Sequence, residues 1–185
     1  MRVLMLNPPY LEGFMRNARW EAISIAGSEW LPIWLAYATG WLEKHGHKVK
    51  LLDAGAERLN REETYEMVSV FKPELTAVYI TTTSMGDDLE IANRIKGMGS
   101  EVVLVGPWCS IEPGSILKNS GKVSMLVDGE FDFPVLELAE GKPKEKIPGL
   151  VWKNRSGKIT HNPGNPAVAA SEHGHLCSKT CSDPS

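Results

Sequence analysis

Short apolar runs alternate with segments of helical periodicity over the first 140 residues of the chain. The apolar runs have the length and composition of buried strands and lie at 2–6, 48–53, 75–81, 101–105 and 124–127. Between and after them, apolar residues recur at helical spacing at 32–45, 61–71, 87–98, 113–119 and 132–140. The pattern therefore predicts five strands that alternate with helices.

The sequence contains clear start and stop signals for one helix. Asn60 stands before the segment at 61–71, Glu63 follows three residues later, and Pro73 lies beyond its end. An Asn cap with a Glu at the third helical position forms a capping box, and a helix usually ends before a proline. We therefore expect this helix with well-defined limits.

Strands that alternate with helices are typical of right-handed crossovers and a parallel sheet. The sequence predicts an α/β fold: a doubly wound, flavodoxin- or Rossmann-like, five-stranded parallel sheet with a C-terminal β-hairpin at 147–161. We expect a domain at 1–145, the hairpin extension at 146–163 and a disordered or truncated tail at 164–185, which is rich in turn residues. The connector at 11–29 is long for a loop and has no assignment.

Composition restricts the partners. The chain has 185 residues, a net charge of −3 and no cluster of Lys and Arg. This disfavours nucleic-acid and membrane-surface binding by charge. No apolar run is long enough to span a bilayer, the N-terminus does not look like a signal peptide, and there are 3 cysteines. We predict a reducing, cytoplasmic location.

The loops that follow the strands are where chemistry is expected. In an open parallel sheet, ligands bind beyond the carboxyl ends of the strands. The loops after the first, third, fourth and fifth strands begin at residues 7, 81, 106 and 128, and they are rich in Gly, Pro, hydroxyl and aromatic residues. Such loops suit a large planar or polar ligand and not acid–base catalysis. No catalytic residue is predicted.

The common nucleotide motifs are missing. The chain contains neither G-x-G-x-x-G after the first strand nor G-x-x-x-x-G-K-[ST]. This argues against a dinucleotide dehydrogenase and a P-loop NTPase. Asp53 ends the second strand, where a ribose-binding acid can lie, but without the glycines we interpret it as a turn or cap residue.

Several segments together resemble a known family. They are LNPPY at 6–10, LPIWLAYATGWLEKHGHKVKLLDA at 31–54, TTTSMGDDLEIANRIK at 81–96, VVLVGPWCS at 102–110, VDGEFDFPVLELAEG at 127–141 and PGLVWKNRSGKITHNP at 148–163. In order and spacing they resemble the N-terminal cobalamin (B12)-binding domain of B12-dependent radical S-adenosylmethionine methyltransferases and cyclases. The resemblance covers about residues 1–163.

The resemblance implies that cobalamin binds to these loops. The implied cofactor-binding residues are Asn7, Pro8, Tyr10, Thr81, Thr82, Thr83, Ser84, Met85, Gly106, Pro107, Trp108, Gly129, Glu130 and Phe131. The hydroxyl run at 81–84 would face the corrin ring, although one hydroxyl there could instead cap the next helix. Trp108 stands where the family often has His, and it could stack on the ring or pack at the rim. Glu130 could bind the cofactor or cap the helix at 132.

Two departures from related proteins matter. The D-x-H-x-x-G motif of many B12 carriers is missing, so we expect base-off cobalamin without a protein histidine ligand and predict no metal-binding residue. Cys177 and Cys181 have only the first spacing of C-x-x-x-C-x-x-C, and with His173 and His175 they could also suggest zinc. A [4Fe–4S] cluster and S-adenosylmethionine are therefore expected only in a full-length relative.

The predicted function is a cobalamin-binding domain related to these methyltransferases and cyclases that lacks the radical S-adenosylmethionine catalytic domain. We expect it not to be catalytic alone and to act with such a catalytic domain or a separate enzyme. Two alternatives remain open. One is half of a nucleotide-sugar glycosyltransferase, which would need a second similar domain. The other is a small-molecule sensor of the same fold without the cofactor.

Overall fold

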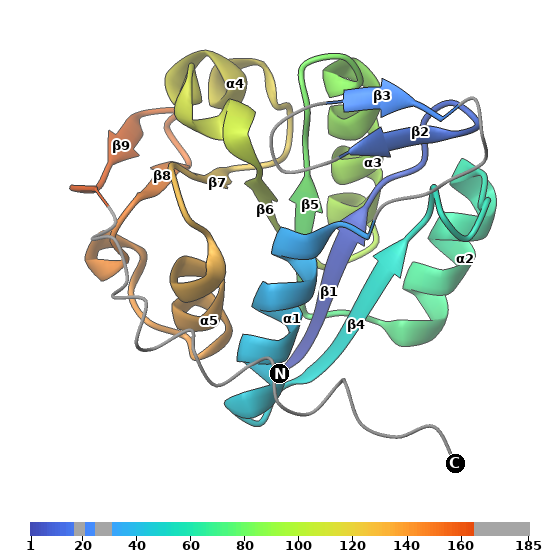
Figure 1. Cartoon of the computed structure of the whole chain (residues 1–185). Helices are drawn as coiled ribbons and strands as arrows, with labels where there is room; N and C mark the ends of the chain where they lie inside the picture. The colour runs from blue at the N-terminus through green and yellow to red at the C-terminus, as the bar shows by residue number, and fades with distance from the viewer. Residues whose placement is uncertain (17–20, 25–30, 165–185) are drawn as a thin grey trace.

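The computed structural model describes residues 1–16, 21–24 and 31–164, and its centre is one seven-stranded sheet (Figure 1). The strand order is β4-β1-β5-β6-β7-β8-β9. The strands of this sheet are β1 (Arg2–Asn7), β4 (Lys48–Asp53), β5 (Leu75–Tyr79), β6 (Glu101–Val105), β7 (Met125–Val127), β8 (Leu150–Lys153) and β9 (Ile159–His161). The first five of them pair in parallel, which confirms the five predicted parallel strands.

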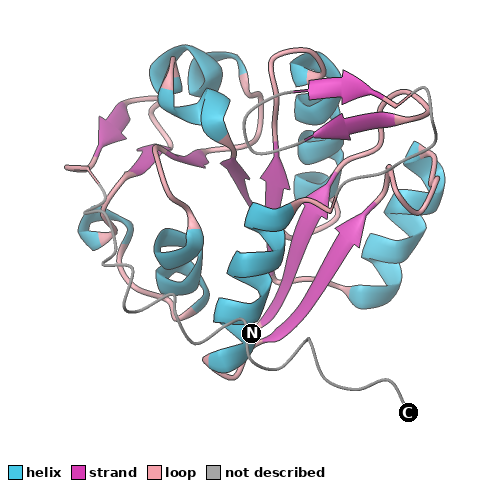
Figure 2. Ribbon diagram, in the orientation of Figure 1, coloured by secondary structure: helices cyan, strands magenta, loops and turns pink. Residues whose placement is uncertain are grey.

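Helices cover both faces of the sheet (Figure 2). They are α1 (Ile33–Lys44), α2 (Arg61–Phe71), α3 (Met85–Gly97), α4 (Pro113–Asn119) and α5 (Asp132–Ala139), with short 3₁₀ helices η1 (Pro107–Ser110) and η2 (Lys144–Lys146). Helices α1 and α5 pack on one core cluster, and α2, α3 and α4 pack on the other. No helix in the described ranges is long and apolar enough to cross a membrane.

The two-sided core explains why the strands are almost continuously apolar. In β1, Val3 and Met5 point to the α1 side, whereas Leu4 and Leu6 point to the α2 side. Successive side chains of a strand face opposite sides of a sheet, so a strand buried on both sides needs apolar residues at every position.

Helix ends follow the predicted signals to within two residues. The capping box of α2 is present, with Asn60 Oδ1 accepting from the backbone N–H of Glu63 at 3.0 Å and Glu63 accepting from the N–H of Asn60 at 2.8 Å. Helix α3 begins at Met85, two residues before the predicted start at 87. The first turn of α3 is therefore part of the loop that carries the hydroxyl run.

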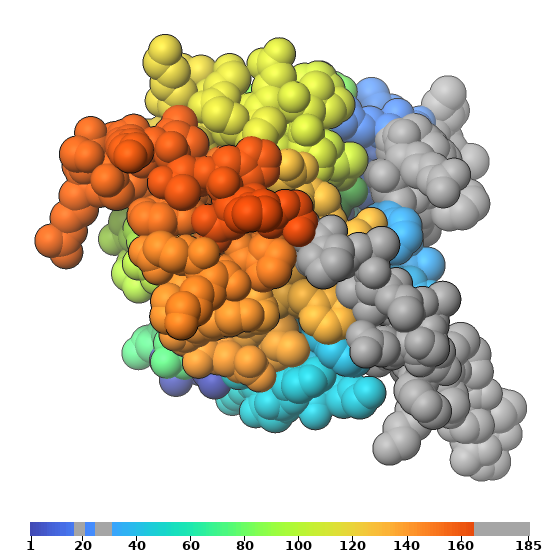
Figure 3. Space-filling model, turned by 90° about the vertical axis from the view of Figure 1, so that its left-hand side faces the viewer, coloured from blue at the N-terminus to red at the C-terminus, as the bar shows by residue number. Residues whose placement is uncertain are grey.

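The predicted C-terminal hairpin extends the same sheet. Strand β8 pairs antiparallel with β7, and β9 pairs antiparallel with β8. The side chain of Asn154 shapes the turn by accepting bonds from the N–H groups of Ser156 and Lys158, both at 3.0 Å. Figure 3 views this end of the molecule, where the hairpin in orange to red lies between α4 and α5. The domain limit at 145 stays a prediction, and the tail at 165–185 lies outside the described residues.

The connector at 11–29 contains an element that the sequence-based prediction missed. Strands β2 (Phe14–Arg16) and β3 (Glu21–Ile23) form a two-stranded antiparallel sheet, with Arg16 opposite Glu21. All three residues of β2 are buried. This small sheet lies beyond the carboxyl ends of β1 and β5, next to α3 (Figure 1).

Candidate functional site

The loops after β1 and β5 meet where the strand order reverses. Strand β1 lies between β4 and β5, so the chain leaves β1 toward β4 on one side and reaches β5 on the other. This is the topological switch point, at which open α/β sheets usually bind ligands. Both loops belong to those that the sequence marked as candidate sites.

A buried arginine joins these two loops. The Arg16 side chain is about 1% exposed. Its Nη2 donates to Asp88 Oδ1 at 2.7 Å and to Ser84 Oγ at 3.0 Å, at the start of α3. Its Nη1 donates to Asn7 Oδ1 at 3.2 Å and to the carbonyl oxygen of Pro8. One guanidinium therefore fixes β2, the end of β1 and the start of α3 to one another.

The carboxylate that pairs with Arg16 belongs to Asp88; it is buried, and both of its oxygens accept hydrogen bonds. Asp88 Oδ2 accepts from Ser84 Oγ at 2.6 Å and from the backbone N–H of Thr81 at 3.2 Å. Burial raises the pKa of Asp88 to about 6, against the opposite effects of Arg16, Ser84 and the Thr81 N–H. Burial also lowers the pKa of Arg16, but an arginine stays protonated in proteins, so a salt bridge is present at pH 7.

The four hydroxyl residues at 81–84 have two different roles. Thr81 and Ser84 are buried, and their hydroxyls are 2.8 Å apart within the Arg16–Asp88 network. Thr82 and Thr83 are exposed. Ser84, the N-cap residue of α3, forms no side-chain cap, because its hydroxyl oxygen accepts from Arg16 Nη2 while its proton is donated to Asp88. The helix-cap alternative therefore does not explain the hydroxyl run.

The exposed pair contacts the small sheet through its backbone. The N–H of Thr82 donates to Glu21 Oε1 at 3.1 Å, and the N–H of Thr83 donates to Glu21 Oε2 at 3.3 Å. The glutamate comes from β3, directly opposite Arg16 in the strand pairing. The small sheet therefore directs the Arg16 cation into the interior and the Glu21 anion toward the exposed loop at 82–83.

The loops after β6 and β7 lie beside the switch point and are tied together. Gly106 has φ +122°, and a Cβ at this position would lie 2.7 Å from the carbonyl oxygen of Ile80, so the loop requires glycine. The N–H of Gly129 donates to Ser110 Oγ at 2.7 Å. Trp108 is half-buried and packs against the core on the α3 side.

The remaining predicted residues are mostly structural in their contacts. Asn7 is buried, and its Nδ2 donates to Asp53 Oδ1 at 2.8 Å, while Asp53 also accepts from the N–H of Ala56 as a turn residue does. Phe131 is buried and lies edge-on to Tyr79. Among the other predicted residues, Met85 packs against the α3-side core, Pro107 begins η1, and Gly129 and Glu130 are exposed. Whether these residues touch a cofactor stays a prediction.

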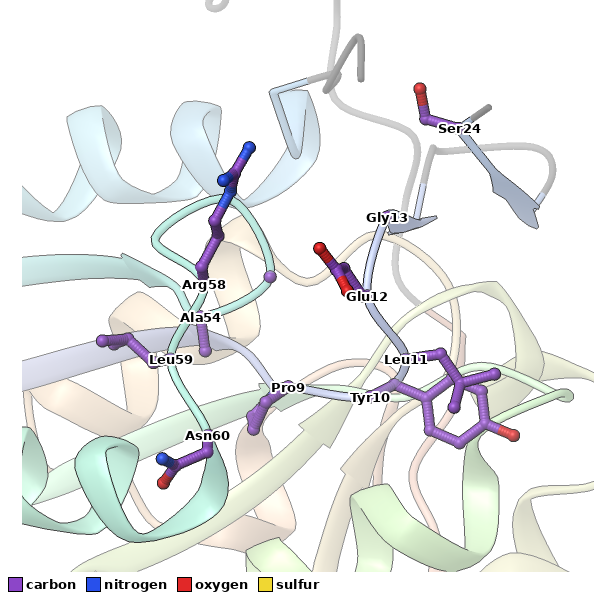
Figure 4. A pocket seen from close by; sticks show the side chains of 11 residues that line it. Pro9, Tyr10, Leu11, Glu12, Gly13, Ser24, Ala54, Arg58, Leu59 and Asn60 are labelled. Atoms are coloured by element: carbon purple, nitrogen blue, oxygen red, sulfur yellow. The ribbon is translucent and has the colours of Figure 1, made fainter. Parts of the chain in front are cut away.

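A cavity of about 650 Å³ lies between the loop after β1 and the loop after β4 (Figure 4). Tyr10 and Leu59 contribute to its lining, and Glu12 and Arg58 come from opposite walls. Arg58 has φ +53°, a left-handed conformation that is uncommon outside glycine. The loop after β4 was not among the predicted site loops. Its small residues at 54–56, directly after a strand, were the available signal.

Among the described histidines, His47 and His161 lie away from the loops after β1 and β5, although His161 contacts the loop after β7. His47 Nδ1 is 3.3 Å from the N-terminal amino group, at the amino end of the sheet. His161 Nε2 is 2.9 Å from Asp128 Oδ2, but it belongs to β9, and three strands separate β9 from β5. At the usual spacing between neighbouring strands, the distance across the sheet from β9 to β5 is about 19 Å. Within 1–16, 21–24 and 31–164, no group of three or more His, Cys, Asp and Glu residues is arranged to hold a metal ion.

Solved structures with the same fold bind cobalamin. The cobalamin-dependent S-adenosylmethionine radical enzyme OxsB, with aqua-cobalamin and S-adenosylmethionine bound, superposes with a TM-score of 0.73 at 15% identity, covering 93% of this chain and 23% of that chain. The radical S-adenosylmethionine methyltransferase TsrM from Kitasatospora setae, with cobalamin and a [4Fe-4S] cluster bound, gives 0.70 at 23% identity, covering 90% and 29%. At these low sequence identities, the structural similarity establishes a shared fold and nothing more.

Sequence comparison gives relatives that are longer than this chain. An uncharacterized methyltransferase of Pyrococcus horikoshii is 25% identical over 174 residues, which cover 91% of this chain and 36% of the relative. The anaerobic magnesium-protoporphyrin IX monomethyl ester cyclase of Rubrivivax gelatinosus is 24% identical over 178 residues, covering 91% and 30%. The chain thus spans about a third of these relatives. The family model of the B12 binding domain matches residues 22–138, and the chain therefore belongs to the B12-binding domain family.

Proposed function

We propose that this chain binds cobalamin over the carboxyl ends of β1, β5, β6 and β7 and holds it for chemistry carried out by a catalytic domain. The observation that carries the proposal is the exposed loop at Thr82 and Thr83, which lies at the switch point and is backed by the buried Arg16–Asp88 pair. Family membership supplies the class of ligand.

The residues present fit a corrin. The rim of a corrin carries amide groups, which both donate and accept hydrogen bonds. The loop after β5 offers two backbone N–H groups that already bind an oxygen pair, together with two exposed hydroxyls. Thr82 and Thr83 are short, so a flat ring can approach the backbone closely. Bound cobalamin would supply the methyl-carrying or electron-transferring cobalt.

The chain's own residues would bind and orient the cofactor. The Arg16 network holds the loops after β1 and β5 in one geometry before the cofactor arrives, which reduces the ordering cost of binding. We further propose that cobalamin binds in the base-off form without a protein histidine ligand, because His47 lies at the amino end of the sheet and His161 already contacts Asp128 at 2.9 Å. The two cofactors of radical chemistry, the iron–sulfur cluster and S-adenosylmethionine, would belong to the catalytic domain.

A titration with hydroxocobalamin and methylcobalamin, followed by visible spectroscopy and desalting, tests the proposal. We expect saturable binding with a base-off spectrum and retained colour. The double change Thr82→Leu/Thr83→Leu adds bulk on the exposed loop without touching the buried pair, so it should remove retention while circular dichroism is unchanged. Ser69→Leu, on the exposed surface of α2, is the matched control and should retain the cofactor. No binding by the folded wild-type chain would overturn the proposal.

A further inference from the structure

We propose that the backbone N–H groups of Thr82 and Thr83 form a cradle for a ligand oxygen, and that the Glu21 carboxylate fills this cradle until a ligand replaces it. The ligand group is an amide or carboxylate oxygen on the rim of a macrocycle. The inference rests on the proposed function, because it names the group that enters the same loop.

The geometry is that of a small anion site. Two consecutive N–H groups donate to the two oxygens of one carboxylate, at 3.1 and 3.3 Å. Consecutive backbone N–H groups that converge in this way make concave sites for anionic or carbonyl oxygens. Both threonines are exposed, so solvent and ligands reach the cradle when Glu21 turns away.

Glu21 is not needed to hold the small sheet in place. The anchor is on the other strand, where Arg16 is bonded to Asp88, Ser84 and Asn7. Phe14 and Met15 of β2 are buried as well. Glu21 itself is only half-buried. Rotation of its side chain would therefore open the cradle without breaking the contacts that fix β2.

An internal group in a binding site lowers the measured affinity. The fraction of molecules with an empty cradle sets the apparent dissociation constant, so a ligand has to displace Glu21 before it binds. A carboxylate accepts stronger hydrogen bonds than a neutral amide oxygen does. Glu21 is thus an effective competitor for the amide groups of a corrin, and its removal strengthens binding.

The test compares Glu21→Ala, Glu21→Gln and the control Glu43→Ala, which removes an exposed acid from α1. We expect Glu21→Ala to lower the dissociation constant for hydroxocobalamin about threefold to tenfold, the range set by the net strength of one hydrogen bond. Glu21→Gln keeps one acceptor oxygen and should change the constant less. Glu43→Ala should equal the wild type. Unchanged or weaker binding by Glu21→Ala would overturn the inference.

A second readout does not depend on cobalamin. In ligand-free protein, Glu21→Ala should shift the amide ¹H–¹⁵N signals of Thr82 and Thr83, and sodium acetate should then shift them back in this variant but not in the wild type. Sodium chloride at equal ionic strength is the control. Signals that do not respond to acetate would refute the cradle. Failure of every protein to bind cobalamin, with the acetate response intact, would refute the proposed function and leave the cradle supported.

Discussion

The change of Arg16 to Met tests whether the buried ion pair holds the candidate site together. Methionine fills a similar volume but leaves the Asp88 carboxylate buried and without its cation. Removal of one partner from a buried pair costs about 3–5 kcal/mol. The exposed pair of Arg2 and Glu74, at 4.0 Å and about half accessible, provides the control. For Arg2→Met we expect a loss below about 1 kcal/mol.

The loss in Arg16→Met should depend on pH in a defined direction. The folded-state pKa of Asp88, about 6, lies above its usual value of 3.8, so ionisation of Asp88 disfavours the folded state as pH rises through 6. Because the charge of Arg16 lowers this pKa, its removal raises the pKa further. The destabilisation should therefore be greater at pH 7 than at pH 5, and each unit by which the Asp88 pKa rises further adds up to about 1.4 kcal/mol to this difference.

Urea unfolding followed by circular dichroism at pH 5 and pH 7 measures both effects. The double variant Arg16→Met/Asp88→Asn removes the buried charge and should recover at least half of the lost free energy. If Arg16→Met does not fold, Arg16→Lys, which keeps a charge but loses the forked contacts, gives the same comparison. A loss below about 1 kcal/mol for Arg16→Met at pH 7 would refute the view that this pair organises the site.

Three further results are expected. Gly106→Ala should destabilise the chain by about 2–3 kcal/mol more than Gly129→Ala in urea unfolding. The reason is that, of these two glycines, only Gly106 has a backbone atom close to the position of an added Cβ, at 2.7 Å. Equal unfolding midpoints for the two variants would contradict this. Cys109 is fully buried, and burial raises the pKa of its thiol, so iodoacetamide at pH 8 should alkylate Cys109 only in urea, as peptide mass mapping would show; a labelled native Cys109 would be evidence against the packing. Burial raises the pKa of Tyr79 to about 12, so Tyr79→Phe should remove the last step of the phenolate absorbance titration, and loss of an earlier step would oppose that assignment.

The parallel sheet was predictable from sequence because its strands are buried on both sides. Runs such as 101–105 are apolar at nearly every position, and turn or cap residues mark the ends of the helices between them. These signals come from residues close together in the chain, so they can be recognised without knowing which elements pack against one another. The small sheet of β2 and β3 lacks such signals, because each strand has three residues and Arg16 and Glu21 read as surface positions.

The candidate site was predictable in position but not in its inner structure. The loops were marked by their place after the strands, and the structure brings those after β1 and β5 together. The separate roles of Thr81 and Thr82 depend on Asp88 and on Arg16, which lies 72 residues before Asp88 in the chain. A local pattern of hydroxyls carries no information about a contact of this range, and only tertiary packing decides which hydroxyl is buried.

The two edge strands of the sheet influence whether copies of this chain aggregate in solution. An edge strand with free backbone groups can add a strand from another molecule, which starts aggregation. In the described ranges β4 forms one edge, where Lys48 and Lys50 add positive charge, and β9 forms the other, with three residues. Charge on one edge and shortness on the other oppose edge-to-edge growth. Replacing both lysines with valine would therefore be expected to lower solubility at high protein concentration.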